Sequence, residues 1–86
     1  MEVEINGKKF VLSKPSGYKL LKVVDQSKDT ADLMRDLIHI CIEPKLSKEE
    51  IESLEPKDFF VLSTAVTNLL ADDLKNLQEL MKSSTK

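Results

Sequence analysis

The stretch MEVEINGKKFVL, residues 1–12, decides how the fold begins, because apolar and polar residues alternate on both sides of Asn6-Gly7. Asn-Gly between two alternating runs is the strongest short-range signal for a hairpin with a two-residue type I′ turn. That turn places Glu4 directly opposite Lys9, a favourable pair of charges. Strand alternation then gathers the apolar side chains on one face. These are Met1, Val3, Ile5, Phe10 and Leu12.

A two-stranded hairpin is not stable by itself in water, so its apolar face needs a cover. We expect the rest of the chain to supply that cover. The outer edges of the two strands are expected to remain unpaired, and an exposed edge can recruit another strand. Lys8, Lys9 and Lys14 lie around the hairpin and disfavour stray edge pairing. The sequence favours a stabilising lid over a second association surface.

The chain is predicted to be one small domain, residues 1–86, in which residues 1–13 form the hairpin. Of its residues, 41% are hydrophobic and 33% are charged. Its single cysteine cannot form an internal disulfide, which suits a reducing compartment. No apolar run reaches the length of a signal peptide, or the roughly 18 residues that mark a membrane span. We therefore expect a cytoplasmic protein with no membrane partner.

Helix-capping residues follow the hairpin. Ser16 caps a helix over residues 17–26, and Asp29 or Thr30 caps a second helix that ends before Pro44. The second helix becomes apolar almost all round through residue 42, which is typical of a buried helix.

Two further helices complete the helical part, residues 16–82. Ser47 opens a capping box for a short third helix. Pro56 precedes a fourth helix over residues 57–82, which contains no internal Gly or Pro. This last helix is predicted to be the longest, roughly 35–40 Å, and its second half to project. Residues 83–86 are expected to fray. The pattern predicts an α+β fold that is mostly helical.

The second half of the last predicted helix carries an apolar row with spacings of 4, 3 and 4. The row consists of Leu70, Leu74, Leu77 and Met81. This spacing is typical of one helix packing along another. One interpretation is packing within the chain, on the buried second helix. The other is that the row docks a helix of a partner or of a second copy, which makes it the candidate partner-binding site.

No set of side chains in the sequence is typical of catalysis. His39 is flanked by isoleucines, and Cys41 lies on the apolar face of the same helix, so neither has the partners that a catalytic role needs. One His and one Cys cannot form a structural zinc site, and the clustered aspartates lack the pattern of a calcium loop. Gly7 and Gly17 do not form a phosphate-binding loop. We predict a protein that is not an enzyme and uses no cofactor or metal ion.

Charge is distributed unevenly along the chain, whose net charge is −2. Residues 1–28 contain six Lys and three acidic residues, whereas residues 29–86 carry an acidic excess. Nucleic-acid binding usually needs a dense basic stripe, and the third and fourth predicted helices carry mainly Glu and Asp on their polar faces. We therefore predict no nucleic-acid partner.

The order of these elements resembles a known family over about residues 10–70. The pattern is a Pro-containing entry to the first helix, an apolar helix that ends at a proline, a capped turn, and an acidic residue that opens a long helix. The residues that carry it are Pro15, Pro44, Leu46, Ser47, Glu49, Glu50, Ile51, Leu54 and Asp58. The chain is similar in this respect to the small tail assembly chaperones of long-tailed bacteriophages and related prophages.

The resemblance implies a non-catalytic role in virion assembly. Such chaperones bind the tape measure protein, a long helical ruler, keep it soluble while tail tube subunits polymerise around it, and are then shed in the host cytoplasm. It also implies a short form of a product that a ribosomal frameshift can lengthen. The alternative is a helical adaptor without a phage role, which self-associates through the last helix or the hairpin edge.

Overall fold

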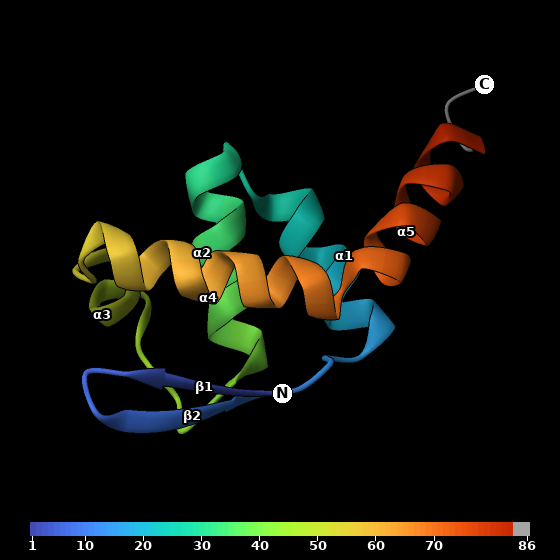
Figure 1. Cartoon of the computed structure of the whole chain (residues 1–86). Helices are drawn as coiled ribbons and strands as arrows, with labels where there is room; N and C mark the ends of the chain where they lie inside the picture. Colours follow the sequence, from blue (N-terminus) through green and yellow to red (C-terminus); the bar gives the residue numbers. More distant parts are fainter. Residues whose placement is uncertain (84–86) are drawn as a thin grey trace.

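The computed structural model describes residues 1–83, except the side chains of Met81 and Ser83. This part of the chain is mostly helical, with an antiparallel hairpin at its start (Figure 1). The elements, in chain order, are β1 (Glu2–Ile5), β2 (Lys8–Leu12), α1 (Gly17–Gln26), α2 (Thr30–Cys41), β3 (Ile42–Glu43), α3 (Lys48–Glu52), α4 (Pro56–Leu69) and α5 (Ala71–Ser83). The predicted α+β class is therefore confirmed, with five helices in the described residues instead of four.

The hairpin has the predicted turn and register. Asn6 and Gly7 both have positive φ angles, 52° and 78°, as a type I′ turn requires. Glu4 pairs with Lys9, and the ladder extends one residue before β1, to the pair of Met1 and Leu12. There the Leu12 N–H donates to the Met1 carbonyl at 2.7 Å, and the Met1 ammonium donates to the Leu12 carbonyl at 3.2 Å. Local sequence was sufficient here because the turn residues and the strand alternation favour the same register.

A third strand changes the prediction for the edges of the hairpin. Ile42 leaves the helical conformation at the end of α2, and Ile42–Glu43 pair antiparallel with β2. The strand order is β1-β2-β3, so the expectation of two unpaired edges is wrong for β2, whose outer edge carries β3. Ile42 was expected in the helix, but its side chain is fully buried in this short strand. The following Glu43-Pro44 peptide bond is cis.

The helices cover one face of the sheet, as expected. Figure 1 shows α4 crossing the middle of the molecule, with the hairpin beside it and α2 passing behind. The core is a single cluster to which the sheet, α1, α2, α3 and α4 each contribute. Its buried members are Ile5, Phe10, Leu12, Leu20, Leu37, Ile38, Cys41, Ile42, Ile51, Leu62, Val66 and Leu70. Met1, by contrast, is half exposed at the end of the hairpin face.

The predicted helix starts are confirmed by their hydrogen bonds. The Ser16 hydroxyl accepts from the Lys19 N–H, and the Asp29 carboxylate accepts from the Asp32 N–H at 2.8 Å. At the start of α3, both bonds of the capping box form between Ser47 and the residue three positions later. These contacts link residues three apart, which is why the sequence alone predicts them.

The predicted fourth helix is in fact two helices. Residue 70 lies outside regular helical geometry, with φ −104° and ψ 11°, and separates α4 from α5. The two helices contain 14 and 13 residues, so the prediction that the last helix is the longest is wrong. No Gly or Pro marks the break. The break instead coincides with tertiary packing. The Leu70 side chain is fully buried at this point, and α5 turns away from the sheet (Figure 1).

Candidate protein-binding surface

An open apolar groove runs between the start of α1 and α5. Its volume is about 320 Å³. Most of its lining comes from leucines and from the loop that precedes α1. The lining residues are Lys14, Pro15, Gly17, Leu20, Leu21, Leu70, Asp73, Asn76, Leu77 and Leu80. The groove therefore joins the predicted apolar row on the last helix to a helix some fifty residues earlier in the chain.

The structure divides the predicted row Leu70, Leu74, Leu77 and Met81 by depth. Leu70 is fully buried at the floor of the groove, so it holds the fold together and has no exposed surface for a partner. Leu74 and Leu77 are half-buried and pack against the core, and Leu77 also lines the groove. The side chain of Met81 lies outside the described residues. Leu70 therefore belongs to the core, and Leu74 and Leu77 pack against it.

Two exposed leucines in the groove were not among the predicted site residues. Leu80 on α5 is 59% exposed, and Leu21 on α1 is 39% exposed. Leu80 lies three positions after Leu77, a spacing that places both on one side of a helix. That spacing could have predicted from the sequence that Leu80 lies beside Leu77. Leu21 lines the groove because of how α1 packs beside α5. Local sequence patterns do not predict that packing.

Charged groups border this groove. The Lys14 ammonium lies 3.2 Å from the Asp73 carboxylate and ties the loop before α1 to the first turn of α5. Both side chains are substantially exposed, so the pair contributes little to stability, at most about 1 kcal/mol. Its effect is to border an apolar floor with one cation and one anion.

The single histidine and the single cysteine both contact other parts of the fold. His39 places its Nδ1 2.8 Å from the Leu46 carbonyl oxygen and so fastens the chain after α2. Cys41 is buried in the core, and burial raises the pKa of its thiol to about 11. The thiol is therefore protonated and a poor nucleophile near neutral pH.

Arg35 contacts three acidic side chains, two on α2 and one on α3. The Arg35 guanidinium donates to the Asp36 carboxylate at 2.9 Å and to the Glu52 carboxylate at 2.7 Å, and lies 3.4 Å from that of Asp32. These hydrogen bonds, that of Asp36 above all, raise the pKa of the guanidinium. The network fixes α2 to α3. Among the described residues, no group of three His, Cys, Asp or Glu side chains is arranged to hold a metal ion.

Comparisons with known proteins identify no relative: no family model, no curated protein and no solved structure matches this chain. Within residues 1–83, every helix falls short of the length or the hydropathy that crossing a bilayer requires.

Proposed function

We propose that this protein is a non-catalytic binding protein whose groove between α1 and α5 receives an apolar stripe of a helical partner. The observation that carries the proposal is the pair of exposed leucines, Leu21 and Leu80, on opposite sides of an apolar floor. An amphipathic helix can place side chains at i, i+3, i+4 and i+7 into such a groove. The groove is open and small, which suits an association that must later be reversed.

The specific role that we propose is that of a cytoplasmic tail assembly chaperone of a long-tailed phage or prophage. Its partner is then the tape measure protein, with the tail tube protein as a possible second one. The support is the sequence resemblance over residues 10–70 together with a groove that suits a long helical client. A client of that kind exposes apolar stripes before the tail tube surrounds it, and covering one stripe would keep it soluble.

Self-association is the second candidate, and the distribution of charge favours it. The exposed Lys19 and Lys22 lie on α1, whereas the first turn of α5 carries Asp72 and Asp73. A two-fold pairing of two copies could bring the acidic start of one α5 against the basic α1 of the other. Opposite charges placed in this way increase the rate and specificity of association. In this case the protein is an adaptor without a phage role.

Co-expression with the tape measure protein of the same phage or prophage tests the chaperone proposal. We expect the soluble yield of that protein to rise and the two proteins to co-purify. The double variant Leu21→Asp/Leu80→Asp should lose both effects, because it places charge at the two exposed leucines of the groove. Tyr18→Asp on α1 is the matched control, since Tyr18 is a 71% exposed helix residue that does not line the groove.

Circular dichroism of each variant must show unchanged helix content for this result to count. Co-purification retained by the double variant would contradict the groove as the binding site. Sedimentation of the wild-type protein alone separates the two candidates. A dimer that the same double substitution dissociates, with no gain in solubility of the tape measure protein, would favour the adaptor.

A further inference from the structure

The strand β1 has one edge that no other strand covers. The sheet order is β1-β2-β3, so only β2 flanks β1 among the described residues. In an antiparallel ladder, every second residue directs its N–H and C=O toward the neighbouring strand and the others direct theirs away. Met1 and Leu12 exchange both hydrogen bonds, so they are a bonded pair, as are the pairs two and four positions further along. The N–H and C=O groups of Glu2 and Glu4 therefore point outward.

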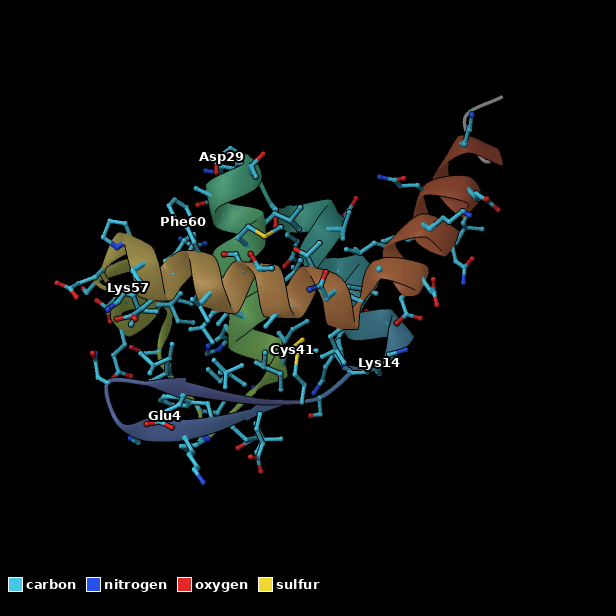
Figure 2. All side chains as sticks on the ribbon, viewed as in Figure 1. Glu4, Lys14, Asp29, Cys41, Lys57 and Phe60 are labelled. Carbon is cyan, nitrogen blue, oxygen red and sulfur yellow. The ribbon has the colours of Figure 1, made fainter. Side chains whose placement is uncertain are left out.

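An apolar trough lies beside this open edge. Its volume is about 550 Å³, and β1 and α4 form its walls. Met1 is 52% exposed at one wall, and Phe60 and Val61 are 63% and 44% exposed at the other. Figure 2 labels Glu4 on the hairpin and Phe60 on α4. A strand added to β1 would direct alternate side chains into the trough, because its inward face continues the apolar face of the hairpin.

The charges on the solvent face of β1 determine which side chains are favourable on the solvent face of an added strand. Glu2 and Glu4 are both exposed on the solvent face of β1. Lys9 faces Glu4 from β2, whereas Glu2 faces Val11, whose other neighbour is Glu43 on β3. Glu2 therefore has no basic residue directly opposite it on β2. Basic residues directly opposite are favourable, and acidic residues are unfavourable.

A second copy of this chain does not meet that requirement. Antiparallel pairing of two β1 strands must keep apolar faces on the same side of the sheet. Every such register that pairs more than one residue of each strand sets Glu2 or Glu4 opposite a glutamate of the other copy, and like charges directly opposite are destabilising.

We propose that the edge of β1 binds an extended segment of a partner protein in which basic residues alternate with apolar ones. The backbone of that segment pairs with Glu2 and Glu4, its apolar side chains enter the trough beside Phe60 and Val61, and its Lys or Arg residues lie beside the two glutamates. This is recognition by strand addition, in which main-chain bonds provide affinity and alternate side chains provide specificity. It uses a different surface from the groove between α1 and α5 and does not depend on the function proposed for it.

Three short peptides test this proposal on the full-length protein. The probe is an acetylated and amidated heptapeptide of alternating Lys and Val, with Lys at both ends. The first control replaces every Lys by Glu. The second keeps the Lys-Val sequence but methylates the backbone nitrogens that would donate to β1. Binding is measured at physiological ionic strength by amide chemical shifts and by hydrogen exchange.

We expect the Lys-Val peptide to slow hydrogen exchange at the amides of Glu2 and Glu4 and to bind roughly tenfold more tightly than either control. The double variant Glu2→Lys/Glu4→Lys should reverse the preference between the Lys and Glu peptides. Equal affinity of the methylated peptide would overturn strand pairing. Absence of binding, shifts centred on α5, or a dimer formed through β1 would each overturn the proposal.

Two single variants separate the backbone contribution from the side-chain contribution. Glu4→Pro removes an outward N–H and leaves the bonds between β1 and β2 in place, as proline on an edge strand allows. Glu4→Gln removes the same charge and keeps the N–H. We expect Glu4→Pro to weaken binding several-fold more than Glu4→Gln does, with circular dichroism unchanged. Equal effects of the two variants would contradict main-chain pairing at this residue.

Discussion

The consecutive helices α4 and α5 have nearly the same length and carry the same kind of apolar spacing, yet they differ in burial. On α4, Leu62 and Val66 are fully buried between the sheet and α2. On α5, none of the described side chains is fully buried, and Leu80 remains exposed. The difference shows that an apolar row predicts which side of a helix faces inward. How deeply it is buried depends on what lies opposite. The open groove lies where α5 meets the start of α1 and the loop before it.

Truncating one leucine on each helix should give the largest contrast. Leu62→Ala removes a fully buried side chain and is expected to lower the free energy of unfolding by about 2–5 kcal/mol. Leu80→Ala should change it by no more than about 0.5 kcal/mol. Urea denaturation followed by circular dichroism measures both. A large loss for Leu80→Ala would mean that α5 is as firmly packed as α4, and would remove the basis for an open groove.

The two glycines provide a second contrast, between the hairpin and the groove. Gly7 has a positive φ of 78°, so Gly7→Ala should cost about 1–2 kcal/mol although the space around it is free. Gly17 begins α1 with free space around its Cα, so Gly17→Ala should stabilise by up to about 1 kcal/mol. Thermal unfolding of the two variants checks the signs. A stabilising Gly7→Ala would contradict the type I′ turn.

Salt should weaken the ion pair at the start of α5. Lys14 and Asp73 form an exposed ion pair, so their coupling free energy in a double-mutant cycle with alanine is expected to be about 0.2–1 kcal/mol. High salt should reduce this coupling toward zero because exposed charges are screened. The cycle is measured by urea denaturation at two salt concentrations. A coupling that salt leaves unchanged would mean that the pair is less exposed than the structure shows.

Acid should act on the capping box at the start of α3. Hydrogen bonds from the backbone and then the side chain of Ser47 lower the pKa of Glu50 below 4.5. A carboxyl group whose pKa is lowered by folding stabilises the fold fully above its unfolded pKa and loses that contribution as pH falls through the folded one. We expect protection of the Ser47 amide against hydrogen exchange to fall below about pH 4.5, and the fall to disappear in Glu50→Gln. The same loss in Glu50→Gln would assign it to another carboxylate.

Short-range interactions account for what could be predicted. The Asn6-Gly7 turn, the Ser16 cap and the capping box at Ser47 each depend on residues within a few positions of one another, and all are present. The third strand was missed because two residues carry too little pattern to indicate a strand. The break at residue 70 was missed because the usual signals, Gly and Pro, are absent. The acidic pair Asp72-Asp73 was the one local sign that a new helix starts there.

The candidate site was predicted only in part, for the same reason. The predicted apolar row includes Leu70 and Leu77, which line the groove, but it omits Leu80 and does not indicate that Leu70 is buried at the floor. Leu21 also lines the groove, but it lies on α1, so the row on the last helix could not indicate it.

The sequence by itself determined the hairpin and its register, the starts of the helices and the mostly helical α+β class, because turns, caps and strand alternation are set by neighbouring residues. Only the tertiary structure decided that β3 closes one edge and leaves β1 open, that the long apolar row breaks into α4 and α5, and that Leu70 is covered while Leu80 is not. These outcomes depend on which distant segments meet. That choice follows from the burial of the whole core, and no single window of sequence contains it.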